Sequence, residues 1–220
     1  MGIAYNPSIV SSGLVLCLDA ANPRSYSGTG NTCYDISSTG NHGTLTNGPT
    51  YNSNNKGYFV LDGSNDYIQQ TSSTSLSINS FAMSCWFKTN TQGDQKLVSL
   101  SNSYHPLQII NNTFRTCTVG CTAGTANVVN NQWNYACIVG DATSVRVYLN
   151  GNSNVEITQS SISSTMTGII RVGAVGAGTG SDAAGYYYNG NISQVLIYNR
   201  PLSVAEINKN FETSRSRYGV

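Results

Sequence analysis

Short apolar segments recur along the chain, and most of them are bounded by Gly, Asn, Ser or Pro. Residues 81–88 show the clearest alternation: Phe81, Met83, Cys85 and Phe87 share one face of an extended chain, and polar or mixed residues share the other. Further strand-like segments lie at 13–20, 58–62, 67–68, 97–100, 107–110, 133–139, 145–149 and 169–172. So many short strands separated by turn residues predict an all-β fold, an antiparallel β-sandwich or jelly roll.

The last apolar segment predicts a strand that is followed directly by a short C-terminal helix. The strand begins near Gly190, and Pro201 ends it because proline cannot donate to a sheet ladder. Ser203 and Glu206 stand three residues apart, which is the spacing of a helix capping box. Ile207 and Phe211 would then share one face of the helix and contact the sheet.

The charge and hydrophobicity of the chain argue against nucleic acid and membranes as partners. Charged residues make up 10% of its 220 residues and the formal net charge is +1, so the sequence has no basic cluster for nucleic acid. No apolar run is long enough to cross a membrane, and the N-terminus lacks the pattern of a secretory signal. We expect one domain over residues 1–220, synthesised in a cytoplasm, with neither nucleic acid nor membrane as a partner.

Six cysteines leave two interpretations open. Most of them lie in apolar segments, where free cysteines pack as small hydrophobic residues. Cys117 and Cys121 flank a three-residue turn, so they would face each other across a hairpin and either form a disulfide or stay reduced. The spacings and the two isolated histidines fit no common zinc site.

Several segments together resemble the laminin G-like domains of the concanavalin A-like lectin/glucanase superfamily. They are GLVLCLDAANPRSY (13–26), FVLDGSNDYI (59–68), MSCWFK (83–88), WNYACIV (133–139), VRVYLNG (145–151) and YNGNISQVLIYNRPLSVAEI (188–207). The resemblance implies a jelly roll of two curved antiparallel sheets. The first segment is also similar to versions carried by virion proteins of tailed phages. Fold alone does not choose among the lectins, hydrolases and structural modules of this superfamily.

The resemblance also implies one calcium ion at the rim of the sandwich. Asp62, Asn65 and Asp66 lie in one polar turn. Asn191, or its neighbour Asn189, would approach this turn if the last strand, which begins near Gly190, pairs as in the family. Calcium prefers six to eight oxygen ligands of this kind. The alternative is that these side chains form Asx turns with their own backbone. Calcium is therefore the one cofactor that the sequence suggests.

Aromatic residues beside polar loops are the candidates for binding a sugar or a protein partner. They are Tyr104, His105, Tyr186, Tyr187 and Tyr188. Trp86 and Trp133 lie in strand-like segments and are expected in the core. No closely spaced acidic pair matches the two carboxylates that glycosidases need, so we expect no enzyme activity.

The sequence favours a non-enzymatic structural protein of a tailed-phage virion, such as a capsid decoration protein on the virion surface. Its partners would be capsid or tail proteins and other copies of itself, since self-association is common in such parts. The alternative is a carbohydrate-binding module for host recognition, whose partner is a cell-surface glycan. The two hypotheses differ in what the exposed face binds, a protein lattice or a sugar.

Overall fold

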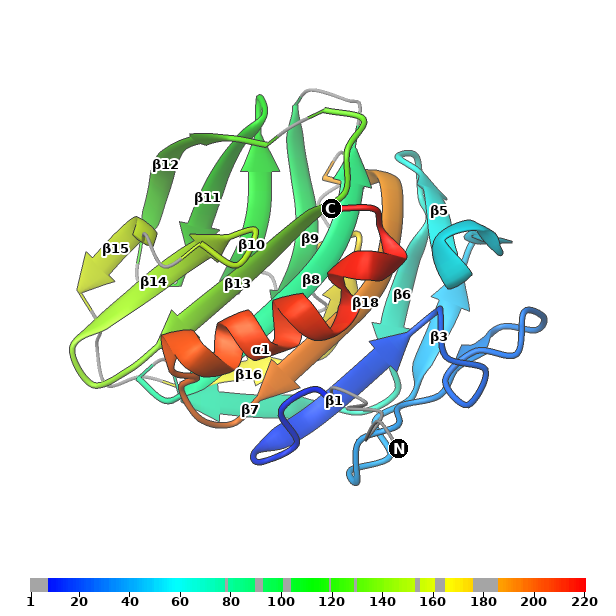
Figure 1. Cartoon of the computed structure of the whole chain (residues 1–220), viewed down its shortest axis with the longest axis horizontal. Helices are drawn as coiled ribbons and strands as arrows, with labels where there is room; N and C mark the ends of the chain where they lie inside the picture. Colours follow the sequence, from blue (N-terminus) through cyan, green and yellow to red (C-terminus); the bar gives the residue numbers. More distant parts are fainter. Residues whose placement is uncertain are drawn as a thin grey trace, which may run out of the picture.

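The computed structural model of the chain describes residues 8–77, 79–89, 93–100, 104–118, 120–128, 130–152, 155–160, 165–175 and 186–220. Within these residues, two eight-stranded antiparallel sheets pack face to face (Figure 1). The front sheet, nearer the viewer, has the order β15 (Val155–Ser160), β14 (Ser144–Leu149), β13 (Asn134–Gly140), β8 (Phe81–Thr89), β18 (Asn189–Tyr198), β5 (Tyr58–Asp62) and β4 (Thr50–Asn52), with β1 (Leu14–Asp19) also paired to β18.

The back sheet has the order β12 (Cys121–Asn127), β11 (Thr113–Cys117), β10 (Tyr104–Ile110), β9 (Asp94–Leu100), β17 (Ile170–Val172), β6 (Tyr67–Gln70), β3 (Gly43–Thr46) and β2 (Thr32–Cys33). A separate pair is formed by β7 (Thr74–Ser77) and β16 (Thr165–Gly168). The predicted antiparallel sandwich is therefore confirmed.

The apolar residues that alternate along residues 81–87 point into the core between the two sheets. Phe81, Met83, Cys85 and Phe87 of β8 are all completely buried in it. Burial of a large apolar side chain such as Phe or Met stabilises the fold by about 1.5–3 kcal/mol. The inward face of β8 therefore anchors the strand in the core. β18 lies beside β8 and continues the same core through Ile192, and its other side pairs with β5 and β1.

The C-terminal helix begins where the capping box predicts. α1 (Val204–Ser214) has Ser203 as its N-cap: the Glu206 amide donates to Ser203 Oγ, and the Ser203 amide donates to the Glu206 carboxylate at 2.9 Å. Two short 3-10 turns, η1 (Asn54–Lys56) and η2 (Arg215–Arg217), complete the helical elements of the described residues. None of these helices is long and apolar enough to span a membrane.

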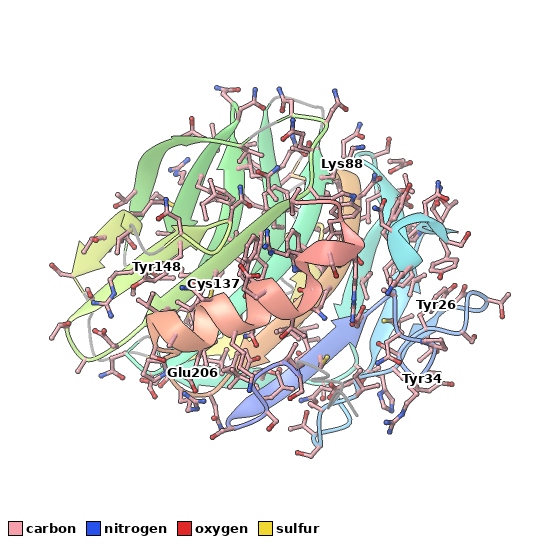
Figure 2. All side chains as sticks on the ribbon, viewed as in Figure 1. Tyr26, Tyr34, Lys88, Cys137, Tyr148 and Glu206 are labelled. Carbon is pink, nitrogen blue, oxygen red and sulfur yellow. A yellow bond between two sulfur atoms is a disulfide. The ribbon has the colours of Figure 1, made fainter. Side chains whose placement is uncertain are left out.

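α1 covers a second apolar cluster on the outer face of the front sheet (Figure 1). Trp86 is the centre of this helix-covered cluster: its ring stacks on Tyr218 at 4.2 Å and on Phe211 at 5.4 Å between centroids. Its indole N–H donates to Ser214 Oγ at 2.8 Å, so the one polar atom of the buried ring is satisfied. Figure 2 shows Cys137 of the same cluster beside the helix that carries Glu206.

Two regions are more ordered than the sequence pattern suggested. The Asn- and Ser-rich segment 22–55, which carries no clear strand pattern, contributes β2 and β3 to the back sheet and β4 to the front sheet. Asp35 organises it by accepting hydrogen bonds from the amides of Cys17 at 2.8 Å and Asn41 at 2.9 Å. The polar strands β7 and β16 carry only Leu76 and Met166 as buried anchors, which explains why hydrophobicity did not reveal them.

Candidate functional site

The turn with the predicted calcium ligands folds back on its own backbone. Asp62 Oδ1 accepts the amides of Ser64 at 2.8 Å and Asn65 at 3.3 Å, and Asp66 Oδ2 accepts the amide of Asp62 at 3.2 Å. The hydrogen bond from the Ser64 amide is the main cause that lowers the pKa of Asp62, whereas burial raises the pKa of Asp66. This is the geometry of an Asx turn, in which carboxylate oxygens are engaged by amides rather than left for a metal.

Asn191 does not join this turn. In the pairing of β5 with β18, Asp62 lies opposite Asn189, whereas Asn191 lies opposite Val60. On its other side Asn191 pairs with Lys88, whose ammonium would repel a divalent cation placed at the Asn191 side chain. Among the described residues, no group of three His, Cys, Asp or Glu side chains is placed to hold a metal ion. The turn thus forms the hydrogen bonds that the Asx-turn alternative predicts, with Asn191 outside it, and the calcium site that the resemblance implied stays a prediction.

Cys117 and Cys121 lie directly opposite each other at the end of the β11–β12 hairpin. Their sulfur atoms are joined in a disulfide. The remaining cysteines, Cys17, Cys33, Cys85 and Cys137, are free and buried. Gln108 Nε2 donates to Cys117 Sγ at 2.8 Å, which links the disulfide to the middle of the back sheet.

Tyr188 belongs to the core and not to a ligand-facing surface. Its ring is completely buried between the sheets, and its amide donates to the Gly173 carbonyl at 2.8 Å. Successive side chains of an extended chain point in opposite directions, so the three consecutive tyrosines cannot all face solvent. The sequence-based prediction grouped Tyr188 with its neighbours; the structure separates it from them.

Tyr186 is presented on the outer face of the back sheet. Its side chain is 36% exposed, and the Lys96 ammonium lies 4.6 Å from the centre of its ring. Lys96 is held in turn by an ion pair with Asp94 and by Gln108 Oε1 at 2.5 Å. Burial lowers the pKa of Lys96, and the hydrogen bond with Asp94 opposes that change. The ring of Tyr186 therefore has a fixed cation beneath it.

Tyr187 is held by a second pair of contacts, over the neighbouring strands β6 and β17. Its ring stacks on Tyr67 of β6, with 6.4 Å between centroids, and the Arg171 guanidinium lies 4.7 Å from the Tyr67 ring. Arg171 is fixed by Gln69 Oε1 at 2.9 Å and by the Val175 carbonyl at 3.1 Å. We call the rings of Tyr67, Tyr186 and Tyr187 the tyrosine surface.

Sequence reasoning missed Tyr67 of this surface and the two cations that contact its rings, Lys96 and Arg171. A signal existed for Arg171, because it is a single cation within the apolar segment 169–172. The contact with Tyr67 depends on the pairing of β17 with β6, which the sequence does not fix. Tyr104 and His105 begin β10, and their side chains lie outside the described residues.

The carboxylates of the described side chains are all engaged. Five form ion pairs: Asp19 with Arg217, Asp94 with Lys96, Asp141 with Arg146, Glu206 with Arg200, and Glu212 with Arg215. Asp35, Asp62 and Asp66 accept hydrogen bonds from main-chain amides. The side chains of Glu156 and Asp182 lie outside the described residues. The carboxylates that the structure describes thus have structural partners.

Comparison with protein families gives one match. The family model described as the concanavalin A-like lectin/glucanases superfamily, of the laminin G type, matches residues 62–208. This range includes the Asp62–Asp66 turn, most of both sheets and the first half of α1. The comparison with curated proteins found no match.

Solved structures share the fold at low sequence identity. The chain is similar to the Trypanosoma rangeli sialidase solved with sialic acid (TM-score 0.70, 12% identity), and covers 34% of it with 96% of its own length. It is similar to domain 4 of the extracellular arabinanase AbnA from Geobacillus stearothermophilus, solved with arabinotriose (TM-score 0.62, 14% identity). This match covers 91% of the present chain and 98% of that domain. It is also similar to the binding domain of botulinum neurotoxin serotype D (TM-score 0.65, 17% identity), and this match covers 92% of the present chain and 52% of that domain. The chain thus spans about one third of the sialidase and about half of the neurotoxin domain.

Proposed function

Because the chain belongs to the concanavalin A-like lectin/glucanases superfamily, we propose that it is a non-enzymatic carbohydrate-binding module whose ligand stacks on the tyrosine surface. The observation that carries the proposal is the held position of the two rings: Tyr186 lies against the buried Lys96 ammonium, and Tyr187 stacks on Tyr67, whose ring contacts the buried Arg171 guanidinium. Aromatic rings bind the C–H faces of sugars, and rings held in one orientation lose little conformational entropy when a ligand arrives.

Hydrogen-bonding groups flank the rings. Across the pairings of β3, β6 and β17, Thr44 lies beside Gln69, and Gln69 lies beside Arg171. Asp94 is 29% exposed next to Lys96 and presents carboxylate oxygens near Tyr186. Hydroxyl, amide and carboxylate groups beside an aromatic ring suit a neutral sugar with several hydroxyls.

The structural neighbours are compatible with this proposal. The arabinanase domain is covered over 98% of its length, and its structure was solved with arabinotriose. The non-enzymatic part of the proposal is supported by the described carboxylates, each of which has an ion-pair or main-chain partner instead of facing a second acid across a cleft.

A glycan array followed by calorimetry tests the proposal. Wild-type protein is expected to bind a subset of neutral glycans, with arabinotriose as one soluble probe, and to release no reducing sugar from them. Tyr186→Ala and Tyr187→Ala should each weaken binding about tenfold, which corresponds to the upper end of the about 0.5–1.5 kcal/mol that a stacked ring contributes. Tyr34→Ala is the matched control, since Tyr34 is 51% exposed and its ring contacts His42. A double variant that binds like wild type would refute the proposal.

The resemblance of residues 13–26 to phage versions supports a second proposal, a place on the surface of a tailed-phage virion. A surface with few charges and many Tyr, Asn and Ser side chains suits binding to other proteins of a shell or to further copies of the chain. Mass spectrometry of purified particles, followed by cryo-electron microscopy, would locate the protein on the capsid or at the tail. Its absence from virions would overturn this second proposal and leave the first intact.

A further inference from the structure

A small polar pocket opens at one end of the front sheet, away from the tyrosine surface. Its volume is about 180 Å³, and it lies where β8 ends and β18 begins, beside β5 and the turn before β13. The residues that line it are Val60, Lys88, Thr89, Asn131, Asn189, Gly190 and Asn191. Strand pairing places Asn191 between Val60 and Lys88. Figure 2 shows Lys88 near the end of β8, beyond the last turn of the C-terminal helix.

The polar side chains of the pocket are available to a ligand. Within the described part of the chain, the side chains of Lys88, Asn131, Asn189 and Asn191 form no hydrogen bond or ion pair with the protein. Thr89 differs, because its hydroxyl donates to the Asn189 carbonyl at 3.0 Å. Three carboxamides and an ammonium group in one small pocket offer both donors and acceptors.

The floor of the pocket is fixed by the backbone. Gly190 has φ 153°, and a Cβ there would collide with the Lys88 carbonyl and the Tyr188 ring, so only glycine fits. Asn131 adopts φ 58° and its amide donates to the Thr89 carbonyl at 2.8 Å, which holds the rim against β8. The backbone that carries the polar side chains is therefore held before any ligand arrives, which lowers the cost of binding.

The charge of the pocket selects an anion. Lys88 is the charged residue of the lining, and Asp62, the neighbouring carboxylate opposite Asn189, accepts the amides of its own turn. An ammonium group that carries no ion pair attracts a carboxylate, and carboxamide N–H groups add charge-assisted hydrogen bonds. The pocket is smaller than most drug-sized sites, so it suits one ring and not a chain.

We propose that this pocket binds a single carboxylate-bearing sugar residue. Lys88 and the amide N–H groups hold the carboxylate, the carboxamide oxygens accept the hydroxyls, and Val60 contacts the C–H face. The site lies on the opposite sheet from the tyrosine surface, so it adds a second carbohydrate contact that recognises charge. It does not depend on the tyrosine surface.

Nuclear magnetic resonance titration of the full chain tests this site with three probes. D-Glucuronate is expected to shift the side-chain amide signals of Asn131, Asn189 and Asn191. D-Glucose lacks the carboxylate and propionate lacks the hydroxyls, so each should bind at least tenfold more weakly. Tyr186→Ala with Tyr187→Ala should leave the glucuronate titration unchanged, which separates this proposal from the proposed function.

Two variants with a matched control complete the test. Lys88→Gln removes the charge and Asn191→Asp adds an opposing one without changing shape, so each should weaken glucuronate binding at least tenfold. Lys209→Gln, on the exposed side of α1, should not. Melting temperatures and backbone spectra of each variant verify folding. Glucuronate that binds no better than glucose, equal affinity for propionate, or wild-type affinity in both pocket variants would overturn the proposal.

Discussion

The two outer faces of the sandwich use aromatic residues in opposite ways. On the front sheet, Trp86 and Tyr135 are buried beneath the C-terminal segment, and the Trp86 ring contacts both Tyr135 and Tyr218 of that segment. On the back sheet, Tyr67, Tyr186 and Tyr187 keep part of each ring at the surface, with Lys96 and Arg171 beneath them. Ring type does not distinguish the two faces, since tyrosines occur on both.

What differs is the group that contacts each ring. In the helix-covered cluster the partners are other rings and aliphatic side chains, and burial of apolar area supplies the energy. On the back sheet Lys96 contacts Tyr186 and Arg171 contacts Tyr67, while Tyr187 stacks on Tyr67. The two cations are themselves held by Asp94, Gln69 and Gln108. The comparison predicts that substitutions on the front face reduce stability, whereas those on the back face reduce binding.

The largest effect is expected for Trp86→Ala. The ring is completely buried and loses three aromatic contacts and the hydrogen bond to Ser214. Removal of a buried Trp typically costs about 3–5 kcal/mol of unfolding free energy. Urea denaturation followed by circular dichroism would measure it, with Tyr34→Ala as an exposed control that should change stability by less than about 0.5 kcal/mol. A loss below 1 kcal/mol would mean that the helix contributes little to the fold.

Gly151→Ala should have the next largest effect, because it damages the same cluster from the opposite side. Gly151 has φ 69°, and a Cβ there would overlap the Phe211 ring of α1. Overpacking and the left-handed conformation together should cost about 2–4 kcal/mol. Gly30→Ala is the matched control: its φ is 86° and no atom lies within 4 Å of the new methyl, so it isolates the backbone cost. Equal losses in the two variants would show that the contact with Phe211 is unimportant.

The attachment of α1 should depend on pH through Glu206. Hydrogen bonds from Arg200, at 2.6 and 3.0 Å, lower the pKa of Glu206 to about 2 from its usual 4.5, and the Ser203 amide adds to them. A carboxyl with a depressed folded-state pKa stabilises the protein above its unfolded pKa, and this contribution is lost as pH falls from about 4.5 toward 2.

Glu206→Gln should therefore cost about 1 kcal/mol at pH 7, since the pair is partly exposed and screened by solvent, and only about a quarter of that at pH 2.5. Glu212→Gln is the control, because its ion pair with Arg215 is more exposed and should show little change with pH. Urea denaturation at both pH values measures the difference. A cost that stays the same at pH 2.5 would exclude the carboxylate as its source.

Local sequence signals account for the front face better than for the back face. The capping box, the turn at Pro201 and the alternation of β8 each lie within ten residues, and the structure confirms all three. Local rules are sufficient here because the partners are close in sequence. They also predicted that Trp86 and Trp133 are buried.

The tyrosine surface and the polar pocket lined by Lys88 and Asn191 depend on pairings between distant strands. Tyr67 and Arg171 are 104 positions apart in numbering, and Lys88 meets Asn191 through the register of β8 and β18. A shift of one residue in that register would turn each side chain to the other face of its sheet, and composition does not reveal it. The direction of Tyr188 was missed for the same reason, since the pairing of its amide with Gly173 decides which tyrosine points inward.

The smallest effect on stability is expected for Tyr186→Ala and Tyr187→Ala. Tyr186 is 36% exposed and the contact of Tyr187 with Tyr67 is a single stacked pair, so each substitution should cost less than about 1 kcal/mol. The same substitutions are expected to weaken glycan binding about tenfold, a change of about 1.4 kcal/mol in binding free energy. Urea denaturation and calorimetry on the same samples separate the two quantities. A stability loss comparable to that of Trp86→Ala would show that these rings form a second core, and that the two faces of the sandwich are alike after all.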